Sequence, residues 1–136
     1  MYACSFFLAG CAPSFTGTPN NGKVVYVLDG ARFQDLVWSY NSDGLILEKV
    51  ELLYFRPDTT TFTPVARKVP NKKLQVFASS GYSERVEFYE PATFRILNIV
   101  SNDSRIFQCK LAFENADPPE FPSLAELVVV GKSSDQ

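Results

Sequence analysis

The chain has 136 residues, 46% hydrophobic and 21% charged, so it is long enough for one domain with a substantial core and too apolar to be disordered. Its net charge of −2 excludes the basic footprint of a nucleic-acid-binding protein. The chain contains no histidine, which removes the commonest general base and the commonest metal ligand.

The N-terminal segment is apolar. Residues 1–12 resemble the core of a signal peptide but lack a basic leading region, so we expect them to belong to the folded domain. We expect a single domain over 1–136, with an N-terminal extension and first strand at 1–22, the main β-structure at 23–131 and a tail at 132–136.

Short runs rich in β-branched and aromatic residues follow, separated by clusters of turn residues. We expect strands at 24–28, 33–40, 46–55, 74–78, 85–89, 93–100, 106–113 and 124–130. We expect turns at 19–22, 41–44, 56–58, 70–71, 79–81 and 117–119. No segment keeps a helical period, so the pattern predicts an all-β sandwich or barrel.

Alternation is clearest at 46–55. If Val50, Leu52 and Tyr54 face the core, the side chains between them face outward. Those outward residues are Lys49, Glu51, Leu53 and Phe55. Two large apolar side chains on an outer face are either covered by a neighbouring loop, exposed singly, or part of a partner-binding patch, and the pattern leaves these alternatives open.

One stretch carries a recognisable signature. Apolar residues alternate at Phe94, Ile96 and Ile99, and Asp103, Phe107 and Cys109 follow at fixed spacing. This stretch resembles the E-strand to F-strand signature of V-set immunoglobulin domains. The resemblance covers roughly residues 23–131 and implies an immunoglobulin-like β-sandwich of two antiparallel sheets with Greek-key topology.

The resemblance also implies roles for particular residues. An arginine at the start of strand D pairs with the aspartate of the E–F turn, which here are Arg85 and Asp103. Residues 23–30 match an A′ strand and its glycine turn, and residues 124–131 match the closing G strand.

Departures from the family pattern concern the core. The B-strand cysteine is replaced by Val37 or Trp38, so the usual B–F disulfide is absent. Counting from Gly30 favours Val37 but turns Asp35 inward, whereas the other register buries Leu36, Trp38 and Tyr40. Leu52 stands where the C-strand tryptophan is expected, and Phe107 lacks the hydroxyl of the tyrosine corner.

The three cysteines are Cys4, Cys11 and Cys109. Cys109 is either a buried free thiol or the partner of Cys4 or Cys11 in a non-standard disulfide, and we expect the disulfide.

Catalytic motifs are missing from the sequence. A cysteine nucleophile would have no histidine base, three scattered cysteines do not make a zinc site, and no glycine-rich phosphate loop is present. We therefore expect neither enzymatic activity nor a cofactor or metal.

V-set domains recognise partners through the sheet of strands G, F, C and C′ or through the loops at its end. The resemblance implies a protein-binding face made of Lys49, Glu51, Leu53, Phe55, Gln108 and Lys110. The proline-rich loop at 114–122 is the second choice.

The pattern of departures resembles divergent cell-surface members of the superfamily, including the outermost domains of hydroid allorecognition proteins. It implies an extracellular domain that binds another copy of itself on an opposing cell, with any signal peptide and membrane anchor outside this stretch of chain. A heterophilic immune-type receptor domain that binds a different protein or a glycan stays open as the alternative. Asn102-Asp103-Ser104 is a glycosylation sequon.

Overall fold

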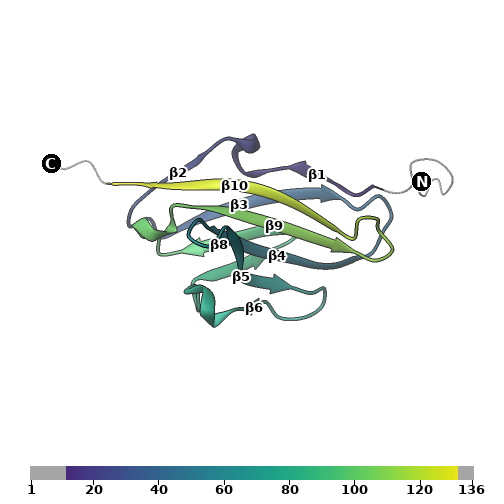
Figure 1. Cartoon of the computed structure of the whole chain (residues 1–136). Helices are drawn as coiled ribbons and strands as arrows, with labels where there is room; N and C mark the ends of the chain where they lie inside the picture. Colours follow the sequence, from purple (N-terminus) through teal and green to yellow (C-terminus); the bar gives the residue numbers. More distant parts are fainter. Residues whose placement is uncertain (1–11, 132–136) are drawn as a thin grey trace.

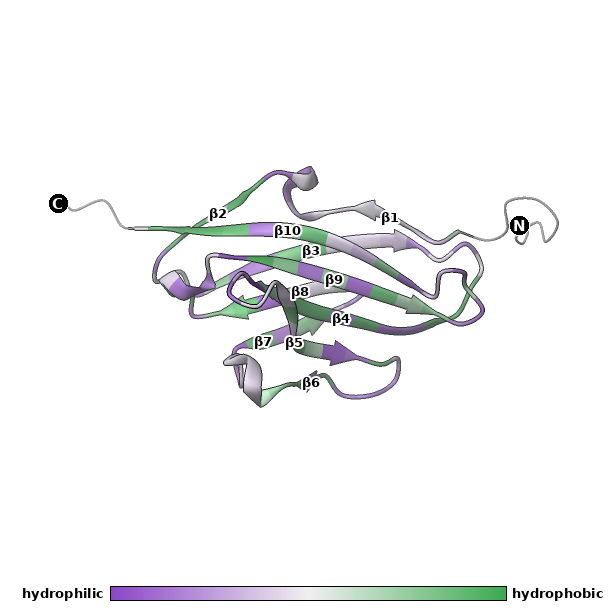
Figure 2. Cartoon of the chain, viewed as in Figure 1, coloured by the Kyte–Doolittle hydropathy of each residue, from purple (hydrophilic) through white to green (hydrophobic). Residues whose placement is uncertain are grey.

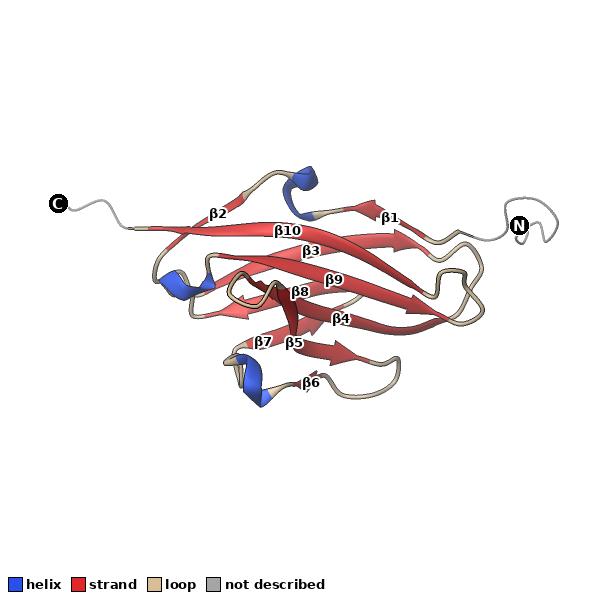
Figure 3. Cartoon of the chain, viewed as in Figure 1, coloured by secondary structure: helices blue, strands red, loops and turns tan. Residues whose placement is uncertain are grey.

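A computed structural model describes residues 12–131. The strands are β1 (Ser14–Gly17), β2 (Val25–Leu28), β3 (Phe33–Asn41), β4 (Leu47–Arg56), β5 (Thr61–Lys68), β6 (Gln75–Val76), β7 (Val86–Tyr89), β8 (Ala92–Leu97), β9 (Arg105–Phe113) and β10 (Glu120–Val130). The short 3₁₀ turns are η1 (Pro19–Gly22), η2 (Ala78–Ser80) and η3 (Ser101–Asp103), seen in Figure 3. No helix of the described residues has the length and hydropathy needed to cross a membrane.

The strands form two sheets that pack face to face (Figure 1). The small sheet has four strands in the order β1-β3-β8-β7, and the large sheet has six in the order β2-β10-β9-β4-β5-β6. The predicted all-β sandwich is confirmed. One detail departs from purely antiparallel sheets, because β2 runs parallel to β10.

The N-terminal strand switches from one sheet to the other. β1 pairs with β3 in the small sheet, and β2 pairs with β10 in the large sheet. The turn η1 joins them through Asn20, Asn21 and Gly22, whose φ angles are 49°, 55° and 84°. Asparagine and glycine tolerate this left-handed backbone best, so the predicted turn at 19–22 makes the switch possible.

Two strand segments that contain a proline were not predicted from the sequence pattern. Strand β5 was not expected, and β10 begins at Glu120, so the predicted loop at 114–122 is reduced to residues 114–119. Pro64 of β5 pairs with β4, and Pro122 of β10 pairs with β9; β6 and β2 do not reach these positions. Each proline therefore lies where its strand is an edge and its missing N–H breaks no ladder.

The register of β3 is the one that buries Trp38. Leu36 and Trp38 are fully buried, whereas Val37 is 50% exposed, so the register favoured by counting from Gly30 is wrong. Asp35 points outward and binds Arg95 of β8, with 2.7 Å between Asp35 Oδ1 and Arg95 Nε. The alternative register would have buried this carboxylate without its partner.

Trp38 links the two sheets at the centre of the core. Its indole Nε1 donates a 3.0 Å hydrogen bond to Ser123 Oγ on β10 of the large sheet. Ser123 lies opposite Cys109, and Cys109 lies opposite Leu52. The core tryptophan is therefore on β3, at the position of strand B, and the leucine is on β4, at the position of strand C. The V-set pattern has its tryptophan on strand C. Trp38 thus fills the centre of the core, where the usual disulfide is missing, with a large aromatic side chain.

Cys109 is a free, fully buried thiol, so the expected disulfide to Cys4 or Cys11 is wrong for this residue. Burial raises the pKa of the Cys109 thiol, which keeps it protonated and unreactive near neutral pH. Three predicted features lie outside the described residues: the cysteines Cys4 and Cys11, residues 1–11 of the signal-like segment, and the tail at 132–136.

Candidate functional site

The predicted binding residues lie together on the outer face of the large sheet, the side turned away from the small sheet. Along β4, Leu52 points into the core while Glu51 and Leu53 alternate with it. Cross-strand pairing sets Leu53 opposite Gln108 and Glu51 opposite Lys110 on β9. The whole predicted set occupies this face: Lys49, Glu51, Leu53, Phe55, Gln108 and Lys110.

Leu53 is not the exposed side chain that alternation suggests, because only 6% of its surface is accessible. It lies between Pro64 of β5 and Gln108 of β9, next to a bulge between Leu52 and Leu53. Phe55 is half-buried and packs against Phe62, with 5.3 Å between the ring centroids. Of the alternatives that the sequence left open, Leu53 is therefore covered by a neighbouring part of the chain, and that part is strand β5 instead of a loop.

A string of ion pairs crosses the outer face. The pairs are Arg67–Glu51 at 2.8 Å, Glu51–Lys49 at 3.6 Å, Lys49–Glu120 at 4.0 Å and Glu120–Lys110 at 3.6 Å. The string connects β5, β4, β10 and β9, and we call it the charged half of the face. Glu51 is only 6% exposed and holds the Arg67 guanidinium, so its carboxylate is a fixed centre of the string.

The other half of the same face is apolar, and most of it was missed from the sequence. Its exposed hydrophobic residues are Tyr26 and Leu28 on β2 (67% and 56%), Ile106 on β9 (36%), and Leu124 and Val130 on β10 (54% and 37%), and the exposed Glu126 of β10 lies opposite Ile106. We call these five residues the apolar half. Figure 2 shows hydrophobic colour along β2 and the C-terminal part of β10. The signal was present in the alternation of β2, where Val25 and Val27 are buried between exposed neighbours.

A shallow groove of about 330 Å³ borders the apolar half at Ile106. Its lining includes Phe55 and Pro57 on one side and Ile106, Glu126 and Val128 on the other. The groove is open to solvent, and its lining combines apolar side chains with Ser104, Arg105 and Glu126. This mixture suits a side chain of a partner protein more than a small polar molecule.

Asp103 anchors the turn between β8 and β9, as the sequence predicts. Arg85 Nη2 lies 2.6 Å from Asp103 Oδ2, and Asp103 is 1% exposed. The same carboxylate accepts the backbone N–H of Val100 at 2.9 Å. Arg85 also donates to the carbonyl oxygens of Leu97 and Asn98, so it ties the end of β8 to the turn.

Tyr82 supplies the hydroxyl that Phe107 lacks, a role that was not expected from the sequence. Its hydroxyl donates a 2.8 Å hydrogen bond to Asp103 Oδ1, and its ring packs edge-on against Phe107. Burial, followed by the hydrogen bond to the Asp103 carboxylate, raises the pKa of Tyr82 above its usual value. The tyrosine-corner hydrogen bond is thus replaced by one from a different strand connection.

The outer face of the small sheet carries a second, smaller cluster. Arg95 donates to both carboxylate oxygens of Asp35 at 2.7 and 3.1 Å and lies 3.9 Å from the centre of the Phe33 ring. Phe33, Val37 and Tyr89 are 46%, 50% and 45% exposed on this side. Here the arginine is already paired and stacked within the chain.

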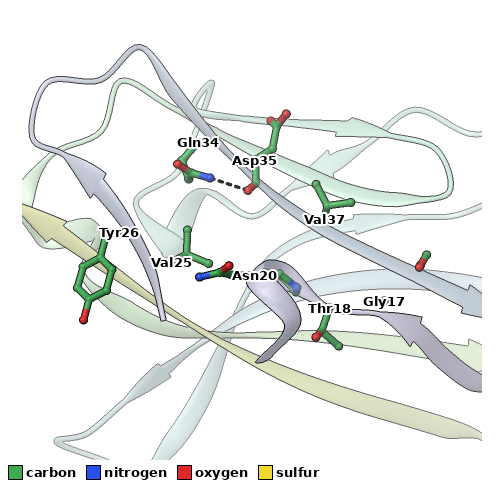
Figure 4. A pocket seen from close by; sticks show the side chains of 10 residues that line it. Gly17, Thr18, Asn20, Val25, Tyr26, Gln34, Asp35 and Val37 are labelled. Carbon is green, nitrogen blue, oxygen red and sulfur yellow. Dashed lines mark hydrogen bonds between the residues drawn. The ribbon is translucent and has the colours of Figure 1, made fainter. Parts of the chain in front are cut away.

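A cavity of about 450 Å³ lies in the notch where the N-terminal strand changes sheets (Figure 4). Two polar side chains of its lining are engaged within the chain: Asn20 Nδ2 donates to the Val24 carbonyl, and Gln34 Nε2 donates to the Asp35 carbonyl. A small-molecule site needs convergent polar groups that are free to bind, so this notch is a consequence of the strand switch.

Within residues 12–131, no three acidic, cysteine or histidine side chains gather as a metal site would require. Asn102, the acceptor of the sequon, is exposed in η3 at the end of the sandwich where β10 terminates (Figure 3).

Solved structures with the same fold are V-type immunoglobulin domains. Murine CRIg matches with a TM-score of 0.69 and 15% identity, over 88% of this chain and 98% of that chain. The two tandem V-type regions of VCBP3, a v-region-containing chitin binding protein, match with a TM-score of 0.71 and 18% identity, over 92% of this chain and 48% of that chain. The first immunoglobulin-like domain of human CD48 antigen matches with a TM-score of 0.59 and 14% identity, over 88% of this chain and 93% of that chain.

No protein-family profile and no curated protein matched the sequence. Identities of this size establish the fold alone. The chain has the immunoglobulin-like β-sandwich fold of V-type domains.

Proposed function

We propose that this domain is the extracellular recognition module of a cell-surface protein and binds another protein through the outer face of the large sheet. The observation that carries the proposal is the position of the apolar half next to the charged half on one face. Exposed apolar side chains gain nothing from water, whereas a partner would remove their surface at about 25 cal/mol per Å².

The composition of the face favours a protein over a small ligand. Leu124, 54% exposed, lies opposite Gln108 on β9, and Pro122 lies opposite Lys110, so apolar surface and paired charge meet along β10. Protein interfaces combine an apolar centre with a polar rim in this way. The rim charges are worth little in affinity because surface ion pairs are weak, but they select the partner and its orientation.

We further propose that the partner is a second copy of the domain on an opposing cell, as the resemblance to hydroid allorecognition domains implies. The charged half supports this because it contains both signs: Lys49, Arg67 and Lys110 against Glu51 and Glu120. A face with both signs can be complementary to itself about a two-fold axis.

The test compares two aspartate variants on opposite faces. Leu124→Asp places a charge on the proposed face, and Val37→Asp places one on the outer face of the small sheet at a matched exposure of 54% against 50%. Leu53 is unsuitable because it is buried. We expect Leu124→Asp to abolish the aggregation of beads coated with the domain and the concentration-dependent sedimentation of the pure domain. Val37→Asp should change neither, and both variants should keep the thermal midpoint of the unmodified domain.

Other outcomes would assign the interface to a different surface or contradict self-recognition. Loss of bead aggregation in Val37→Asp alone would assign it to the small sheet. Unchanged aggregation in both variants would leave the loop at 114–119 as the next surface to test. A domain that stays monomeric and does not aggregate beads would contradict self-recognition and favour a different protein or a glycan as the ligand.

A further inference from the structure

We infer that Asn102 carries an N-linked glycan and that this glycan covers the apolar end of the sandwich around Leu28, Val100 and Val130. The inference rests on the proposed extracellular location, because the sugar is attached only in a secretory pathway. Asn102-Asp103-Ser104 is the only sequon of the chain, since none of the other asparagines is followed two residues later by serine or threonine.

The first support is the position of the acceptor. A usable sequon must lie on the surface, and Asn102 is exposed in the short turn η3 between β8 and β9. The middle residue, Asp103, points inward to Arg85 and Tyr82. A sugar on Asn102 therefore extends into solvent without disturbing the buried anchor of the turn.

The chemistry fixes when the sugar is added. The Asn102 side-chain nitrogen attacks the anomeric carbon of an oligosaccharide carried on a lipid pyrophosphate. A C–N bond forms, the C–O bond to the pyrophosphate breaks, the lipid pyrophosphate leaves, and one amide proton passes to solvent. In the folded domain the Ser104 hydroxyl accepts the Val129 N–H at 2.7 Å, so we expect transfer to occur on the nascent chain, before this bond holds the sequon against β10.

The second support is the exposed apolar surface next to η3. Val100 is 46% exposed and stands two residues before Asn102, and Leu28 and Val130 are 56% and 37% exposed. Asp29 N–H donates to the Val130 carbonyl at 2.9 Å, and Gly30 N–H donates to the Ile99 carbonyl at 2.9 Å. These bonds bring the ends of β2 and β10 to the segment that precedes η3.

The glycan would limit the part of the outer face of the large sheet that a partner can reach. A glycan at this end covers the part of the apolar half made by Leu28 and Val130. It leaves Leu124 and the charged half open. Partner contact is thereby directed toward the part of the sheet that lies away from η3, where the chain forms the 41–44 turn and the 114–119 loop (Figure 1).

The experiment uses the full chain behind a secretion signal in a eukaryotic cell, with Asn102→Gln and Ser104→Thr as variants. Intact mass of the secreted protein, before and after a peptide N-glycosidase, should show a glycan on the wild type and on Ser104→Thr and a bare polypeptide for Asn102→Gln. Equal thermal midpoints would show that all three fold alike. A secreted wild type with the bare mass would overturn the inference, whatever the bead assay shows.

Shielding has its own readout. A dye that fluoresces on exposed apolar surface should give a stronger signal with Asn102→Gln than with the glycosylated wild type. Adding Leu28→Ser and Val130→Ser to Asn102→Gln should remove that increase. Equal dye signals for the glycosylated and sugar-free proteins would refute the shielding. Bead aggregation lost in Leu124→Asp and kept in Asn102→Gln would support the proposed function independently of the glycan.

Discussion

Truncation of Leu52 tests whether the rearranged core is the source of this domain's stability. Leu52 is fully buried in the cluster that contains Trp38 and Cys109. Leu52→Ala deletes three carbon groups, which lose about 2.4 kcal/mol of transfer free energy at about 0.8 kcal/mol each. The cavity that remains adds to this loss, so we expect the free energy of unfolding to fall by about 2–5 kcal/mol.

The assay follows from the composition. Trp38 is the only tryptophan and is fully buried, so its fluorescence reports the opening of the core during denaturant unfolding. The midpoint should fall while the slope with denaturant stays constant, because the surface exposed on unfolding hardly changes. Leu124→Ala is the control. Because Leu124 is 54% exposed, its truncation should change the free energy of unfolding by no more than about 0.5 kcal/mol. If Leu52→Ala is no less stable than the control, Leu52 does not occupy the position of the missing tryptophan.

Three further predictions concern residues whose burial the structure revealed. Leu53→Ala should cost roughly 2 kcal/mol in a thermal or denaturant melt because Leu53 is buried; a change near zero would mean that β5 does not cover it. Arg85→Ala should lower the free energy of unfolding by about 3–5 kcal/mol, because it leaves the buried Asp103 carboxylate without its cation. Tyr82→Phe should lower it by about 1.5–3 kcal/mol, because the carboxylate loses a hydrogen bond. An unchanged melting midpoint in both variants would contradict the role of Asp103 as the anchor of the turn. The raised pKa values of Tyr82 and Cys109 mean that the folded state holds these protons more tightly than the unfolded state, so stability present below about pH 9 should decline as the pH rises above it. The slope should approach about 1.4 kcal/mol per pH unit for each group and be smaller in Tyr82→Phe; a flat profile between about pH 9 and pH 11 would refute it.

The strand-and-turn pattern determined the fold class because it is local. Alternation, turn residues and the spacing from Arg85 to Cys109 lie within short stretches of chain, and the ion pair of Arg85 with Asp103 forms as the V-set resemblance implies. Of the candidate binding residues, the alternation in the sequence correctly placed Lys49, Glu51, Phe55, Gln108 and Lys110 on one face, because it fixes which side of a strand a residue occupies.

Tertiary structure decided what alternation cannot. Whether an outward side chain is exposed depends on its neighbours in space, and Pro64 with Gln108 covers Leu53 although alternation placed it outside. The choice between Val37 and Trp38 was settled by partners distant in sequence, Arg95 for Asp35 and Ser123 for the indole. The apolar half joins β2 to β10, whose residues are about a hundred positions apart, and only the sheet order makes them neighbours. A local pattern therefore determined the strands and the side that each residue faces, whereas burial and the extent of the proposed binding surface depend on long-range packing.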